Sequence, residues 1–240
     1  MRIRAVVLAC LVAMLGLLLA GRARADYAPI DRPGPPLSVP TAKLQSALSC
    51  SAGVNGATRE PVLLVPGTTL NPHSDFSYGW EPALRARGWP YCTVDLPGNG
   101  MGDIQIAGEY VVYAIRAMHA TSGQRVQIVG HSQGGMVPRW ALRFWPDTRP
   151  MVDDVVGLSP SNHGTLDANV VCLLTCAPSI WQQRTNSPFI AALNSIQETF
   201  PGISYTDIYT DSDEVVVPNF GPAASSSRHG GGGEITNVPI

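Results

Sequence analysis

The chain has 240 residues, of which 45% are hydrophobic and only 14% are charged. A chain of this length can form one α/β domain with a sizeable core. Disordered chains combine high charge with few apolar residues, so this composition excludes a largely disordered protein.

The N-terminal segment, residues 1–25, has the layout of a secretory signal peptide. Two arginines precede an apolar run over residues 5–20, and the sequence ARA at 23–25 offers a cleavage site. A membrane anchor is the alternative, but the run is shorter than the roughly 20 residues that a spanning helix needs. We therefore expect a secreted, extracellular chain with no transmembrane span after cleavage.

The charge balance of the cleaved chain argues against one class of partner. Removing residues 1–25 takes away four arginines and leaves 12 basic and 18 acidic residues, a formal net charge of −6. Proteins that bind nucleic acid present a basic surface, so we expect no nucleic-acid partner.

Four cysteines remain after cleavage, and an even count in an exported chain favours disulfides. A Cys50–Cys92 bridge joins the N-terminal arm to the predicted sheet. Cys172 and Cys176 are four residues apart, a separation that one turn of chain can bridge. A zinc site is the alternative for this second pair, but no histidine or further cysteine pair stands nearby, and we expect no metal.

Strands and helices alternate along the chain. Residues 26–60 predict an extended proline-rich arm, a short helix over 41–50 and a loop. Strands are predicted over 61–67, 92–98, 125–130, 153–160, 203–210 and 234–240. Helices are predicted over 77–88, 108–123 and 133–145, and in the stretch between the fourth and fifth strands. Such alternation predicts a mostly parallel sheet with helices on both faces, in a catalytic domain of residues 61–240.

Ser132 lies in the pattern G-x-S-x-G, within the stretch VQIVGHSQGG at 126–135. A strand precedes this serine and a helix follows it, which is the arrangement of a nucleophile elbow. The glycines permit the sharp turn, and the amides at the start of the helix favour developing negative charge. The alternative is a glycine-rich turn with an uninvolved serine. We predict that Ser132 is a nucleophile.

Residues that would assist a serine nucleophile occur before and after it. Thr68 lies in the loop after the first predicted strand and is a candidate oxyanion donor together with the amide of Gln133. A simple turn residue is the alternative for Thr68. Asp211, Asp213 and Glu214 are candidates for the triad acid; a solvated turn or a loose calcium loop is the alternative for that cluster.

Four segments resemble the lipases of the Candida antarctica lipase B type and their secreted actinobacterial relatives. They are PVLLVPGT at 61–68, VPRW at 137–140, APSIWQQ at 177–183 and YTDSDEVVVP at 209–218. The matching order extends from about Leu44 to Asn219. This resemblance implies an α/β-hydrolase fold and hydrolysis of carboxylic esters, including acylglycerols.

Carried over position by position, the resemblance assigns Ser132 as the nucleophile and Asp213 as the triad acid. Thr68 and Gln133 match the oxyanion donors. The apolar stretch 166–181 matches a lid-like segment, for which a buried helix is the alternative. We expect no cofactor, a monomer, and an ester or lipid substrate met at a lipid–water interface.

The general base is harder to place. In this fold the histidine follows the acid in the chain. After Asp213 the sequence contains one histidine, His229, within the run 223–233, which we expect to be a mobile surface loop. We therefore expect that the chain is truncated at its C-terminus and that the family's histidine lies beyond Ile240. His229 as a substitute base and a degenerate site are the alternatives; the side chain of His131 is expected to point away from the serine hydroxyl.

The leading interpretation is thus a secreted serine carboxylic-ester hydrolase. An acyltransferase or polyester hydrolase on the same residues is a second enzymatic interpretation. An acyl-binding protein without turnover is an interpretation from another class, favoured by the missing base and opposed by the intact G-x-S-x-G turn.

Overall fold

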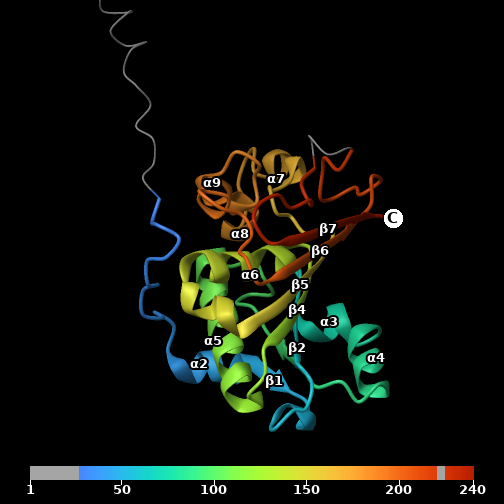
Figure 1. Ribbon diagram of the computed structural model, residues 1–240. Helices are drawn as coiled ribbons and strands as arrows, with labels where there is room; N and C mark the ends of the chain where they lie inside the picture. The colour runs from blue at the N-terminus through green and yellow to red at the C-terminus, as the bar shows by residue number, and fades with distance from the viewer. Residues whose placement is uncertain (1–26, 221–224) are drawn as a thin grey trace, which may run out of the picture.

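Seven strands form one sheet within residues 27–220 and 225–240, which are the residues that the computed structural model describes (Figure 1). Their order is β1-β3-β2-β4-β5-β6-β7. The bounds are β1 (Leu48–Cys50), β2 (Val62–Val65), β3 (Tyr91–Val94), β4 (Val126–His131), β5 (Val152–Leu158), β6 (Ser204–Tyr209) and β7 (Glu234–Pro239). β1 pairs antiparallel with β3, and every other pair is parallel.

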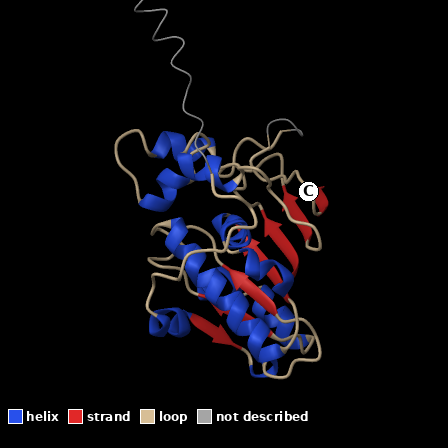
Figure 2. Ribbon diagram, turned by 60° about the vertical axis from the view of Figure 1, so that its left-hand side comes forward, coloured by secondary structure: helices blue, strands red, loops and turns tan. Residues whose placement is uncertain are grey.

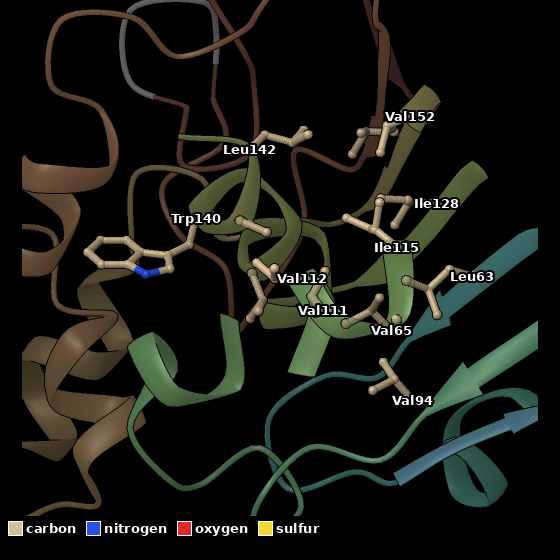
Figure 3. Packing of buried hydrophobic residues seen from close by; sticks show 14 of the residues in the cluster. Leu63, Val65, Val94, Val111, Val112, Ile115, Ile128, Trp140, Leu142 and Val152 are labelled. Atoms are coloured by element: carbon tan, nitrogen blue, oxygen red, sulfur yellow. The ribbon is translucent and has the colours of Figure 1, made fainter. Parts of the chain in front are cut away.

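Helices cover both faces of this sheet, and successive residues of β2 point into two separate cores. Leu63 and Val65 face α5 (Ile104–Ser122) and α6 (Gln133–Phe144), as Figure 3 shows. Val62 and Leu64 face the opposite side, which α3 (Pro72–Phe76) and α4 (Trp80–Ala86) cover. The alternation follows from the two-residue period of a strand. The predicted mostly parallel sheet with helices on both faces is confirmed.

The longest helix, α5, shows why the sequence pattern was readable. Val111, Ile115 and Met118 recur at helical spacing, and all three side chains are buried against the sheet. Asp103 caps the first turn by accepting a hydrogen bond from the amide of residue 105, and Gly123 ends the helix in the left-handed conformation. The predicted helix therefore exists and begins four residues earlier than expected.

The N-terminal arm differs from its prediction in one respect. The helix expected over 41–50 ends early, because α2 (Thr41–Ala47) gives way to the edge strand β1. Cys50 lies opposite Cys92 in the antiparallel pair, and the two form a disulfide. A strand of three residues is too short for its sequence pattern to predict it. The disulfide that joins this strand to β3 was predicted. A 3-10 helix, η1 (Ala52–Val54), follows it.

Three short helices lie together in the upper part of Figure 1, above α6 and beside β6 and β7, and Figure 2 shows helices gathered at the same end of the domain. They are α7 (Leu166–Val171), α8 (Pro178–Gln182) and α9 (Pro188–Leu193), and all come from the connection between β5 and β6. A second 3-10 helix, η2 (Pro146–Met151), leads from α6 into β5. α7 and α8 contribute Ala168, Val171 and Ile180 to a cavity at the carboxyl edge of the sheet, where parallel strands end together. α9 packs on α6 instead, with the ring of Phe189 stacked on Trp140.

Over residues 225–229 the glycine- and serine-rich run packs against the domain and is not a surface loop, whereas residues 230–232 are exposed as predicted. Ser226, Ser227 and His229 are buried. The side chain of Asn219 accepts hydrogen bonds from the hydroxyl of Ser225 and the amide of Ser227, and these bonds hold the segment against the domain. The hydroxyl groups of Ser225 and Ser227, which suggested a solvated loop, form hydrogen bonds with the side chain of Asn219 instead.

Two predictions concern export and the membrane. The proposed signal peptide, residues 1–25, lies outside the described residues. Among the described helices, none combines the length and apolar character that a membrane crossing requires.

Candidate active site

A cavity of about 450 Å³ lies at the carboxyl edge of the sheet, between the strand-end loops and the short helices. Thr68, Ser132 and Asp213 all line it. They come from the loops after β2, β4 and β6, so the fold brings together residues that are 145 positions apart at most. The remaining wall is mainly apolar and includes Leu70, Ala168, Val171, Ile180, Val215 and Val216. An apolar cavity with a few convergent polar groups is the usual form of a small-molecule site.

Ser132 occupies the turn between β4 and α6 with φ 53° and ψ −121°. Residues other than glycine seldom adopt positive φ, so this is a strained conformation that the surroundings must hold. The neighbouring glycines make the turn possible. A Cβ at Gly130 would lie 2.1 Å from the carbonyl oxygen of Gly134, and one at Gly134 would lie 2.1 Å from that of Val65. The strand, turn and helix have the form of a nucleophile elbow.

Of the three acids considered from the sequence, Asp213 is the one that lines this cavity, within the part of the chain that the structure describes. Its Oδ1 accepts hydrogen bonds from the amides of Val215 and Val216, both at 2.9 Å. Asp211 and Glu214 are exposed. Two amide donors fix the Asp213 carboxylate, and its other oxygen remains available to a partner.

Beside the serine, Thr68 is part of a compact amide network. Its hydroxyl donates to Oε1 of Gln133 at 2.9 Å. Gln183 is the residue directly after α8. Its Nε2 donates to the Thr68 hydroxyl at 3.0 Å and to Oε1 of Gln133 at 2.9 Å. Gln133 Nε2 donates to the carbonyl of Gly100. Gln183 was not predicted to belong to this network, although it ends the segment APSIWQQ that carried the resemblance.

His131 lines the cavity as well, and it is bound to a carboxylate rather than to the serine. Its Nδ1 lies 2.9 Å from Oδ1 of Asp75, whose Oδ2 accepts a hydrogen bond from the amide of Gly67. The hydrogen bond to Asp75 raises the pKa of His131; burial opposes this shift, and the charges of Asp75 and Asp213 reinforce it.

The structure places His229 away from the serine. His229 does not line the cavity; its side chain is 1% exposed, with Nδ1 2.5 Å from Oδ2 of Asp207. Its ring also packs edge-on against Tyr205. Burial lowers the pKa of His229, although the hydrogen bond to Asp207 opposes that shift. In the described part of the chain, which includes all five histidines, no hydrogen bond joins a histidine to the Ser132 hydroxyl.

A group of acids lies at the opposite end of the sheet. Carboxylate oxygens of Glu60, Asp153 and Asp154 lie within 4.8 Å of one another among the described residues. Burial raises the pKa values of Glu60 and Asp154, and the neighbouring Asp153 adds to both shifts. Arg125 forms an ion pair with Asp153. The amino ends of β2 and β5 carry these acids, so they are remote from Ser132.

The fold is recognisable in known proteins. Residues 60–172 match a family model described as alpha/beta hydrolase fold. The mature lipase BlEst2 of Bacillus licheniformis superposes with a TM-score of 0.60 at 16% identity, covering 88% of this chain and 87% of that one. The chain therefore has the α/β-hydrolase fold.

Closer similarity is found with lipases of one type. The chain is 34% identical over 186 residues to lipase B of Pseudozyma antarctica, covering 77% of this chain and 54% of that protein. The crystal structure of Aspergillus fumigatus lipase B superposes with a TM-score of 0.79 at 30% identity, covering 92% of this chain and 55% of that chain. The predicted resemblance to lipases of this type is confirmed, and the chain spans about half the length of the lipase B proteins that it matches.

Proposed function

We propose that this protein is a carboxylic-ester hydrolase of the lipase type that acts through an acyl-enzyme on Ser132. The observation that carries the proposal is the single cavity shared by Ser132, Thr68 and Asp213. The relatives at 34% and 30% identity are lipases by name, which supports the same reaction class.

In the proposed mechanism the Ser132 oxygen attacks the carbonyl carbon of the ester while a base, added imidazole in the test below, takes the hydroxyl proton. The amides of Thr68 and Gln133 and the hydroxyl of Thr68 stabilise the resulting oxyanion. In the resting site that hydroxyl donates to Oε1 of Gln133, so it must turn toward the oxyanion when one forms. The donor from Gln183 still holds the Thr68 oxygen in place during this rotation. Asp213 would stabilise the imidazolium that forms when an added imidazole takes the Ser132 proton, which is the role that a triad acid plays toward its base. Collapse of the tetrahedral intermediate breaks the ester C–O bond, the alcohol leaves with that proton, and water then hydrolyses the acyl-enzyme.

We assign the general base to none of the five histidines of this chain. A serine site without its base keeps only part of its acceleration, about 10³–10⁴ over water in the serine-protease template. We therefore expect slow Ser132-dependent hydrolysis that added imidazole increases. A fast reaction that is indifferent to imidazole and is lost in His131→Gln or His229→Ala would contradict this assignment.

The cavity wall and its surroundings favour lipid-like esters as substrates. The wall beyond the serine is largely apolar, which suits an acyl chain. Val170, Leu173 and Leu174 are exposed on α7 and the following loop, and Leu174 is 97% exposed. Contiguous exposed apolar side chains of this kind support contact with a lipid–water interface. The two disulfides, Cys50–Cys92 and Cys172–Cys176, support a secreted location.

Covalent labelling with a fluorophosphonate probe in imidazole buffer tests the proposal, because reaction requires a Ser132 hydroxyl that the oxyanion donors and the added base activate. The expected result is one adduct on Ser132 that Ser132→Ala abolishes. Thr68→Val should slow p-nitrophenyl ester hydrolysis about 10²- to 10³-fold at fixed imidazole, the usual effect of losing an oxyanion donor. Asp213→Asn should slow the hydrolysis as well. The matched control is Asp211→Asn, which changes an exposed neighbouring aspartate and should leave the rate unchanged. Absence of a Ser132 adduct would refute the proposal.

An acyl-binding protein without turnover is the second candidate. It is favoured by one observation, that no histidine among the described residues reaches the serine. Such a protein would bind a fatty acid in the cavity and leave the fluorophosphonate probe unreacted.

A further inference from the structure

One buried carboxylate touches both loops that form the candidate oxyanion hole. Asp75 lies on α3, and its side chain is 9% exposed. Its Oδ2 accepts a hydrogen bond from the amide of Gly67 at 2.9 Å, and its Oδ1 lies 2.9 Å from Nδ1 of His131. Charge-assisted hydrogen bonds to a partly desolvated carboxylate are about twice as strong as neutral ones.

The two hydrogen-bond partners of Asp75, Gly67 and His131, are each next in sequence to a residue of the candidate site. Gly67 directly precedes Thr68, and His131 directly precedes Ser132. The two loops also pack closely, since a Cβ at Gly67 would lie 3.2 Å from the carbonyl oxygen of His131 and 3.3 Å from Cβ of Ser132. Movement of either loop would therefore change the distance between the two donor groups of the hole.

Asp75 itself is held firmly. The short helix α3 begins with a reciprocal pair of hydrogen bonds between Asn71 and Ser74, in which each side chain bonds to the other's backbone amide. Its last residue, Phe76, is buried in the core beneath β2. A carboxylate on so rigid a support can fix the loops that it binds.

We propose that Asp75 is a positioning residue for the oxyanion hole, joining the Thr68 loop to the Ser132 turn through Gly67 and His131. This inference rests on the proposed function, because it assigns the geometry of the same site. Neither Asp75 nor His131 contacts the reacting atoms; they set the spacing between the groups that do.

The charges around His131 define the variants that test this role. Asp75 faces the imidazole from α3 and Asp213 faces it from the loop after β6. Asp75→Asn keeps the size of the side chain but removes its negative charge and one of its two acceptor oxygens, so the hydrogen bonds from Gly67 and His131 lose their charge assistance. His131→Gln removes the second half of the link on a side chain that is 38% exposed and therefore tolerant of change.

The measurement is the rate of Ser132 phosphonylation by the fluorophosphonate probe, separated into probe affinity and maximal rate. A misplacement of about 1 Å near reacting groups can cost about 100-fold in rate. We expect Asp75→Asn to lower the maximal rate between about 10- and 100-fold with probe affinity unchanged. His131→Gln should lower it less, and the double variant should be no slower than Asp75→Asn, because both changes break one link. Asp211→Asn is the matched control.

Equal rates in folded wild type and Asp75→Asn, or additive losses in the double variant, would overturn the proposal. Circular dichroism identifies a variant that fails to fold, and His131→Gln then carries the comparison. A wild type that does not react with the probe contradicts the proposed function instead. In that case an NMR titration of His131, which needs no catalysis, decides the link: the pKa should fall in Asp75→Asn, and an unchanged pKa overturns it.

Discussion

Gly134→Ala tests whether the sharp turn at the serine depends on close backbone contact. A Cβ at this position would lie 2.1 Å from the carbonyl oxygen of Val65 and 2.6 Å from that of Pro66. Both obstacles are backbone atoms of β2 and its following loop, so no side chain can rotate away. The methyl group can be accommodated only if α6 and β2 move apart.

The size of the effect follows from these distances. Non-bonded heavy atoms are optimally about 3.5 Å apart, so full relief of the 2.1 Å contact requires roughly 1.4 Å of backbone movement. Overpacking of a buried site costs about 1–3 kcal/mol, and rigid backbone on the receiving side favours the upper end. Alanine regains about 0.5–1 kcal/mol of helix propensity relative to glycine. We expect a net loss of about 2 kcal/mol in the free energy of unfolding.

Urea unfolding followed by circular dichroism measures this change, and Gly53→Ala provides the matched control. Gly53 lies in the 3-10 helix η1, and a Cβ there would meet Cβ of Pro90 at 3.8 Å, which is ordinary van der Waals contact. The control should lie within about 0.5 kcal/mol of wild type. Gly134→Ala should also slow reaction of Ser132 with the fluorophosphonate probe. If both glycine variants match wild type in stability and in probe reactivity, the close contact does not shape the turn.

Three further predictions concern pH and the surface. Because the pKa of His131 is raised in the folded state, the stability that it adds is complete below its ordinary value of 6.5 and is lost as pH rises through the raised value. The stability gap between wild type and His131→Gln should therefore narrow from pH 5.5 to pH 9, as thermal unfolding can measure; a widening gap would contradict the sign. Burial would raise the pKa of Glu198, but the hydrogen bond from His163 and the charge of Arg139 outweigh it and lower the pKa to about 2. Urea titrations should show the gap between wild type and Glu198→Gln constant above pH 4.5 and closing as pH falls toward 2; a gap that persists at pH 2 would count against it. Leu174→Ser should leave stability within about 0.5 kcal/mol and reduce adsorption to tributyrin droplets, and unchanged adsorption would argue against an interfacial role.

The sheet and the turn at Ser132 could be predicted from the sequence for a physical reason. A β-branched run ending in G-x-S-x-G constrains strand, turn and helix at once, and the glycines are required by contacts as short as 2.1 Å. The buried face of α5 and the disulfide between Cys172 and Cys176, which are four residues apart, were likewise local features. Selection of Asp213 among three acids came from the resemblance, since composition alone left the cluster open.

Features that depend on distant tertiary contacts escaped prediction. The run containing His229 is rich in glycine and serine and predicts a surface loop, yet Ser226, Ser227 and His229 are buried through partners on β6 and at Asn219. The link from Asp75 to Gly67 and His131 joins residues 8 and 56 positions away, and no sequence period connects them. Gln183 stood inside a recognised motif, but its contact with Thr68 spans 115 positions.

The central claim is that the Ser132 hydroxyl stands beside two donors of an oxyanion hole. The most direct test is a crystal structure of the protein after reaction with the fluorophosphonate. We predict phosphorus bonded to Oγ of Ser132, with the phosphonyl oxygen about 2.7–3.1 Å from the amides of Thr68 and Gln133. An adduct on another residue, or a phosphonyl oxygen turned away from both amides, would contradict the account.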